Sequence, residues 1–294
     1  MRSARFTFLA LLLVCSPAPA PRAENTETSA AWLKRVNFYR ATALLPPVVE
    51  EPALSATVAQ HARYMVVHDV IQHSQNRRRS WSTPEGAAAA AVSNLAGSLS
   101  PMEPDFWAVD MWMRAPFHAI GILDPALQQV GFGIHRAPDG KKIQTAAGLD
   151  VIRGRSTRPA AIQYPVVWPA DGSFVPLAAH TGEFPSPLAS CPGYKAPTGL
   201  PLIVQMGPGL GVPQVTRTGI SDGTQWLEHC VFDESTYDNR NRGEEQLGRS
   251  ILASRDAIVL IPREPLTFGS RYRVQVEADG RFIDWTFGVE HLSN

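Results

Sequence analysis

The sequence has few cysteines, no excess of one charge and no apolar run long enough to span a membrane. Lys plus Arg and Asp plus Glu each number 27, so the formal net charge is zero. This balance gives no general sign of nucleic acid or an anionic membrane as a partner. The apolar run Phe6–Val14 is far shorter than the ~20 residues that a transmembrane helix needs. We therefore expect no nucleic-acid partner and no transmembrane span in the mature chain.

The chain also lacks the short motifs of common catalytic sites. Neither Gly-x-Ser-x-Gly nor His-Glu-x-x-His occurs in it. The glycines between Gly207 and Gly211 are not followed by the Lys-Ser/Thr of a phosphate-binding loop. The motifs therefore leave the catalytic residues unknown and favour a binding protein over an enzyme.

The first 23 residues have the pattern of a secretory signal peptide. Arg2 and Arg5 precede the apolar run, and small residues and prolines follow it up to Ala23. A lipoprotein modified at Cys15 is an alternative, although Val14 occupies a position where that processing requires a small residue. We expect export to the periplasm, the cell surface or the medium after the signal peptide is removed.

Removal of residues 1–23 leaves two cysteines, Cys191 and Cys230. An even number of cysteines in an exported chain indicates a disulfide. Closing the loop of about 40 residues between them would contribute ~3–4 kcal/mol to stability.

The apolar spacing is helical in the first part of the chain and extended later. Helical spacing predicts four helices, at Trp32–Tyr39, 51–68, 86–92 and 104–114. Residues 130–134 alternate apolar residues with glycine, Pro138-Asp139-Gly140 is a turn signal and 143–152 follows as a partner strand, so 128–152 is predicted to be a β-hairpin.

Residues beyond the basic stretch that starts at Arg153 have no helical period. Short apolar runs separated by Pro and Gly predict an all-β sandwich, with strands at 166–168, 200–206, 226–232, 257–261, 272–276 and 282–287. Asp279-Gly280 predicts a hairpin turn before the last run. The charged segment 239–246 is expected to be a mobile loop.

Five segments in the first part resemble, in order and spacing, the CAP (SCP/PR-1-like) domains of bacterial type. They are Asn37-x-x-Arg40, Leu54–Met65 followed by His73-Ser74, Ser93–Gly97, Trp112–His118 and Val130–Gly133. The resemblance covers about residues 30–152 and implies an α-β-α sandwich with a central cleft. It also implies that the cleft holds a small apolar or glycan-like ligand.

The second part resembles a bacterial Ig-like domain through the stretch from Pro262 to Val274 and the ending Trp285-Thr286-Phe287. Such domains usually act as spacers or adhesion modules. The expected fold class is therefore α+β. The expected division is 1–23 signal peptide, 24–152 CAP domain, 153–162 linker and 163–294 Ig-like β-sandwich.

The resemblance also suggests which residues line the cleft. In many CAP domains two His and two Glu do so, and the His pair can bind zinc or another divalent metal. By position the histidines are His73 and His118, while the first Glu falls on Ser93, or on Asn94 if the register shifts by one. No residue matches the second Glu. Since zinc sites normally use three or four protein ligands, these residues form a poor zinc site.

Three hypotheses follow for function. The leading one is an exported protein that binds a ligand in the CAP cleft, at the cell envelope or outside the cell. The second is a metal- or His-dependent hydrolase that uses His73 and His118. The third is an adhesion or spacer protein that acts through the β-sandwich. Trp81, beside the basic run Arg77–Arg79, either stacks on a sugar ring or anchors its loop.

Overall fold

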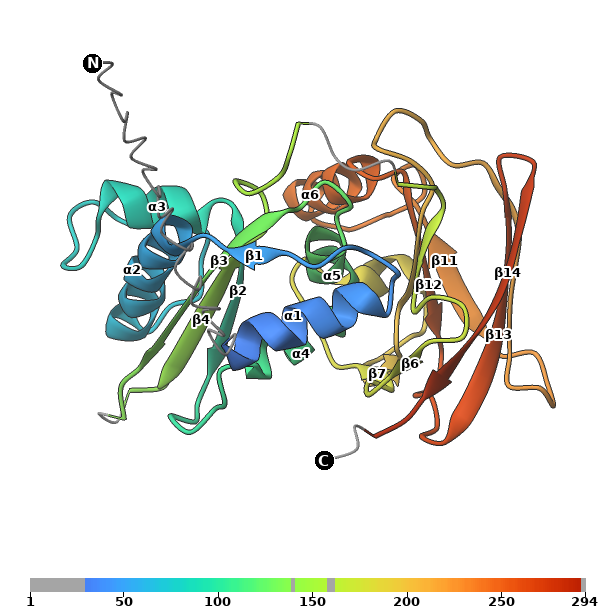
Figure 1. Cartoon of the computed structure of the whole chain (residues 1–294), viewed down its shortest axis with the longest axis horizontal. Helices are drawn as coiled ribbons and strands as arrows, with labels where there is room; N and C mark the ends of the chain where they lie inside the picture. The colour runs from blue at the N-terminus through green and yellow to red at the C-terminus, as the bar shows by residue number, and fades with distance from the viewer. Residues whose placement is uncertain (1–29, 139–140, 158–161, 292–294) are drawn as a thin grey trace, which may run out of the picture.

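The computed structural model describes residues 30–138, 141–157 and 162–291. The expected signal peptide, Cys15 and the turn residues Asp139-Gly140 lie outside the described residues. Two parts lie side by side, a sheet with helices on its faces and a second part made mainly of strands (Figure 1). The mixed helix and strand content agrees with the α+β class. No helix in the described ranges is long and apolar enough to cross a membrane.

The first part is built on a four-stranded sheet in the order β1-β3-β4-β2. Its strands are β1 (Val49–Glu50), β2 (Ser93–Ser98), β3 (Gln129–Arg136) and β4 (Thr145–Asp150). The predicted hairpin is confirmed, because β3 pairs antiparallel with β4 from Gly131↔Asp150 to Arg136↔Thr145. The helices are α1 (Ala31–Ala41), α2 (Pro52–His68), α3 (Pro84–Ala90), α4 (Trp107–Met113) and α5 (Pro116–Ile122).

The glycines of β3 explain how α2 lies so close to the sheet. A Cβ atom on Gly131 would lie 2.4 Å from Leu54 Cβ, and one on Gly133 would lie 2.2 Å from the Ala59 nitrogen. Side chains therefore cannot be accommodated at these two positions of β3. On the opposite face the Phe132 ring stacks on Trp32 of α1 at 4.9 Å. Helices thus cover both faces of the sheet, which gives an α-β-α arrangement.

The Asn37-x-x-Arg40 signature has a structural role. Asn37 exchanges two hydrogen bonds with the backbone of Val48. The buried guanidinium of Arg40 donates to the carbonyls of Pro46, Ile122, Asp124 and Leu127. Burial lowers the pKa of Arg40 to about 10. The arginine thereby holds the segment after α5 against the end of α1.

The second part contains two four-stranded sheets, in the orders β10-β13-β14-β6 and β11-β12-β9-β5, and a β7-β8 pair. The strands are β5 (Val166–Trp168), β6 (Phe174–Val175), β7 (Ala179–His180), β8 (Thr198–Gly199), β9 (Leu202–Gln205), β10 (Val215–Ser221), β11 (His229–Phe232), β12 (Ala257–Pro262), β13 (Ser270–Ala278) and β14 (Arg281–Val289); a 3₁₀ helix covers Pro187–Ser190. Asp279 and Gly280, both with positive φ, form the predicted turn between β13 and β14.

One helix of the second part corrects the sequence analysis. Residues 239–246 were expected to be a mobile loop, but α6 (Arg242–Ala253) begins there. The side chain of Asn241 caps the helix by accepting hydrogen bonds from the backbone nitrogens of Gly243 and Glu244. Two glutamates in the first turn interact favourably with the helix dipole. The charged residues that suggested a loop therefore stabilise the first turn of a helix.

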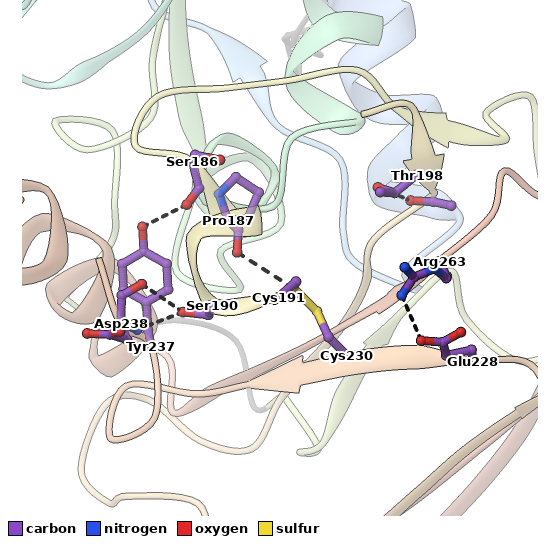
Figure 2. The surroundings of a disulfide bond; sticks show 11 residues. Ser186, Pro187, Ser190, Cys191, Thr198, Glu228, Cys230, Tyr237, Asp238 and Arg263 are labelled. Carbon is purple, nitrogen blue, oxygen red and sulfur yellow. Dashed lines mark hydrogen bonds and ion pairs between the residues drawn. A yellow bond between two sulfur atoms is a disulfide. The ribbon is translucent and has the colours of Figure 1, made fainter. Parts of the chain in front are cut away.

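The disulfide between Cys191 and Cys230 is present, with a Cα–Cα distance of 5.6 Å, and it ties the segment before β8 to β11 (Figure 2). Beside it, Ser190 Oγ donates to the Asp238 carbonyl, and Tyr237 Oη donates to the carbonyl of Ser186. The segments 186–191 and 230–238 are thus joined by one covalent bond and by hydrogen bonds.

The two parts share one apolar core, which extends from Trp32 to Val289. Polar contacts cross the same boundary: Trp168 Nε1 donates to Thr42 Oγ1 at 3.0 Å, and Gln205 Nε2 donates to the Leu123 carbonyl at 2.9 Å. The start of the expected linker is held as well, since Gly154 accepts hydrogen bonds from the backbone of Gln128 and Gln129. The second part is therefore packed tightly against the first.

Candidate functional site

A cleft of about 470 Å³ lies where the first part meets α6 and the loop after β7. We call it the interdomain cleft. His73, Ser93, Asn94 and His118, the four residues suggested by the sequence, all line it. The remaining walls are mainly apolar and come from both parts of the chain; they include Phe117, Ile120, Val151, Phe184, Leu247 and Ile251.

His73 follows α2 and is held by the backbone beside α3. Its Nδ1 lies 2.8 Å from the Ala90 carbonyl, which requires a proton on Nδ1 and leaves Nε2 as the acceptor. Burial lowers the pKa of His73 and outweighs the effect of this hydrogen bond, and the nearby His118 lowers it further. His73 is therefore a neutral imidazole at pH 7.

His118, on α5, is oriented by a carboxylate from the second part. Its Nδ1 lies 2.7 Å from Oε2 of Glu183, whose side chain is only 1% exposed. The two oxygens of Glu183 also accept from the backbone nitrogens of Phe117 and His118, at 3.3 and 3.4 Å. Glu183 thus fixes both the ring of His118 and the start of its helix.

Ser93 and Asn94 begin strand β2 and differ in their partners. Asn94 Nδ2 donates to the His118 carbonyl at 3.0 Å, so Asn94 braces α5. The hydroxyl of Ser93 is buried and has no hydrogen-bond partner among the residues that the structure describes. Asn94 thus supports the cleft wall, and the Ser93 hydroxyl is an unpaired polar group at the cleft.

One end of the interdomain cleft carries positive charge. Arg155 and Arg255 line this end, and both form ion pairs with the buried carboxylate of Asp124. Two guanidinium groups share one carboxylate, which leaves one positive charge uncompensated. The Nε atom of Arg255 is buried without a partner among the described residues.

The donor set does not fit a zinc site of the usual kind. His73 and His118 each have Nδ1 held by an oxygen acceptor, as metal-bound histidines often do. However, within the described ranges no group of three His, Cys, Asp or Glu side chains is placed to hold a metal. The carboxylate of Glu183 already accepts hydrogen bonds from α5 and His118. We therefore derive no chemistry through a metal.

Residues 33–148 match the family model described as "CAP: Cysteine-rich secretory protein family". This segment is therefore a CAP domain, as its sequence motifs implied. A search of curated proteins found no match to the chain. The matched segment ends before Glu183, so the family model does not include the residue that orients His118.

The contributions of Glu183 and α6 to this site were not predicted from the sequence. Glu183 lies 65 residues after His118 and has no motif around it. Its role depends on how the second part packs on the CAP domain, which local sequence patterns do not reveal. α6 had a readable signal, an Asn followed by two Glu in the first turn, but its charged residues suggested a loop.

Proposed function

We propose that this chain is an exported CAP-domain protein of bacterial type whose interdomain cleft binds a small apolar ligand. The observation that carries the proposal is the apolar lining contributed by both parts, notably Phe117, Phe184 and Ile251. Ligand pockets of about 300–1,000 Å³ with mainly apolar walls and a few polar groups are typical of small-molecule sites. This lining favours an apolar ligand over a glycan in the cleft.

The polar residues of the cleft suggest the orientation of the ligand. The uncompensated charge of Arg155 and Arg255 favours a carboxylate or another anionic group at that end. His118 and His73 both line the cleft. Since Nδ1 of His118 is hydrogen-bonded to Glu183, its Nε2 can accept a hydrogen bond from a ligand. An amphiphile with an anionic head and an apolar body matches both features.

The disulfide supports the proposal that the protein is exported. Disulfides persist in oxidising compartments outside the cytosol, and Cys191 is almost completely buried. We place the protein at the cell envelope or outside the cell. We assign the second part to the Ig-like class on its two packed sheets, and we expect it to build one wall of the cleft as well as to act as a spacer.

A binding titration tests the cleft. The probe is 11-(dansylamino)undecanoic acid, a fluorescent fatty acid, titrated into the full chain. Leu247→Gln removes a partly exposed apolar side chain from the wall and should weaken binding by about 5–10-fold. Leu210→Gln, at a strongly exposed leucine outside the cleft, is the matched control and should bind like the wild type. Equal affinities for all three proteins would rule out this cleft as the site.

Hydrolysis is a second candidate function, favoured by the His118–Glu183 pair. A carboxylate on Nδ1 orients an imidazole whose Nε2 can accept a proton from water or a hydroxyl group. If this base acts, a chromogenic short-chain ester should be hydrolysed by the wild type, and His118→Ala should abolish turnover. A chelator should have no effect on the rate. Turnover that persists in His118→Ala would remove this candidate.

A further inference from the structure

We infer that the second part carries a separate binding site for a neutral sugar chain, with Trp226 as its platform. Trp226 belongs to the segment between β10 and β11 and is 63% exposed. It lines a pocket of about 420 Å³ with the β12–β13 connection. This pocket, which we call the Trp226 pocket, shares no lining residue with the interdomain cleft.

A glycine of β10 makes room for the ring of Trp226. A Cβ atom on Gly219 of β10 would lie 2.8 Å from Cζ3 of the indole and 3.2 Å from Cε3. The six-membered ring of Trp226 therefore rests directly on the backbone of β10, and any other residue at position 219 would push it away. The ring is thus packed against β10 at these atoms, while most of the residue remains open to solvent.

An open, fixed tryptophan face is a surface suited to a sugar ring. The face of an aromatic ring carries negative charge density, and it attracts the weakly positive C–H groups on one face of a pyranose. The rigid support matters because a side chain that is already ordered loses little entropy on binding. The indole N–H of Trp226 has no hydrogen-bond partner among the described residues and can donate to a sugar hydroxyl.

The polar residues of the Trp226 pocket indicate a neutral rather than an anionic sugar. Its carboxylates are Asp222, Glu228 and Glu264, and its one cation is Arg263. Arg263 Nη1 lies 2.7 Å from Glu228 Oε1 (Figure 2). The guanidinium of Arg263 also lies 4.8 Å from the centre of the Tyr194 ring. Arg263 is therefore already engaged, and three carboxylates against one cation would repel phosphates, sulfates and uronic acids.

Glu264 is the free acceptor of the pocket. Its side chain is exposed and forms no ion pair within the described part of the chain. A carboxylate accepts hydrogen bonds from two neighbouring hydroxyl groups, and such charge-assisted bonds are stronger than neutral ones. The combination of a fixed ring face and a free carboxylate matches a polyhydroxylated, uncharged ligand. The size of the pocket lies within the range of small-molecule sites.

Calorimetry with the full chain tests the inference. The probes are the β-1,4-linked tetramers of glucose and of N-acetylglucosamine, with a heparin tetrasaccharide and a lysine-rich peptide as charged comparisons. At least one neutral tetramer should bind, and Trp226→Ala should weaken that binding at least about tenfold, since the platform is lost. Glu264→Gln, which keeps the shape of the side chain, should weaken it by a smaller factor.

Trp81→Ala is the matched control. Trp81 is also an exposed tryptophan, at 50%, but it lies in the CAP domain with the guanidinium of Arg63 3.2 Å from its ring centre. This variant should bind the tetramer like the wild type, and so should Leu247→Gln in the interdomain cleft. The inference is overturned if neither neutral tetramer binds, if Trp226→Ala binds like the wild type, or if heparin or the peptide binds better than the neutral tetramers.

Discussion

At the scale of single residues, buried polar groups here are held in one protonation state. His61 on α2 is almost fully buried, with Nε2 2.9 Å from the Gln72 carbonyl and Nδ1 3.0 Å from Gln75 Nε2. The Gln75 amide cannot simply turn over, because its Oε1 accepts from the Thr83 nitrogen. One ring nitrogen must donate and the other must accept, so the neutral imidazole fits the site and the imidazolium does not.

This arrangement predicts a loss of stability in acid. Burial lowers the pKa of His61 to about 4, while in the unfolded chain it lies near 6.5. Between these values the unfolded chain binds a proton that the folded protein does not, so stability falls as pH decreases from 6.5 to 4. His61 should lower the free energy of unfolding by about 2–3 kcal/mol at pH 4.5 relative to pH 7. Urea unfolding at pH 7 and pH 4.5 measures it, and His61→Gln should lose less stability between the two pH values. An equal loss in both proteins would show that His61 is not the cause.

The ring of His118 gives a second prediction at this scale. A carboxylate at 2.7 Å from Nδ1 favours the tautomer with its proton on Nδ1. In Glu183→Ala that preference is lost, and the ring should populate the Nε2-protonated tautomer. Nitrogen-15 NMR of the histidine rings distinguishes the two forms, and the signals of His229, which is bonded within the second part, serve as an internal reference. An unchanged tautomer in Glu183→Ala would mean that Glu183 only caps α5.

At the scale of elements, α6 depends on its first residue. Asn241 accepts hydrogen bonds from two backbone nitrogens of the first turn, so Asn241→Ala should lower the free energy of unfolding by about 1 kcal/mol. Asn241→Asp keeps the acceptor and should restore most of the loss in the same urea titration. Because Leu247 and Ile251 of α6 line the interdomain cleft, Asn241→Ala should also weaken binding of the fluorescent probe.

Elements were predictable where one local pattern decided them. α2 was predicted at 51–68 and is observed at Pro52–His68, one residue off at its start, since a long apolar stripe gives an unambiguous signal. The β3–β4 hairpin was predicted from the alternation around Gly131 and Gly133. The sequence did not reveal that these glycines allow α2 to pack closely against β3. β10 was missed because its residues Thr216 and Arg217 are exposed and polar. The His118–Glu183 contact was beyond local patterns, because domain packing creates it.

At the scale of the whole molecule, a buried ion cluster joins the CAP domain to the second part. Asp124 follows α5 and is almost fully buried, and Arg255 reaches it from the end of α6. Burial lowers the pKa of Arg255, and the carboxylate of Asp124 opposes that effect. Asp124 is the only carboxylate paired with Arg255 in the described part of the chain, so it is the counter-charge of this buried guanidinium within the shared core.

Removing the carboxylate should therefore affect the entire fold. Asp124→Ala leaves the guanidinium of Arg255 buried without a counter-charge, which typically costs about 3–5 kcal/mol. Since one apolar core spans both parts, the wild type should unfold in a single calorimetric transition whose calorimetric and van't Hoff enthalpies agree. Asp124→Ala should lower the temperature of that transition, whereas Asp284→Ala, which breaks an exposed pair with Arg273, should change it little. Two separate transitions in the wild type would show that the CAP domain and the second part are energetically independent.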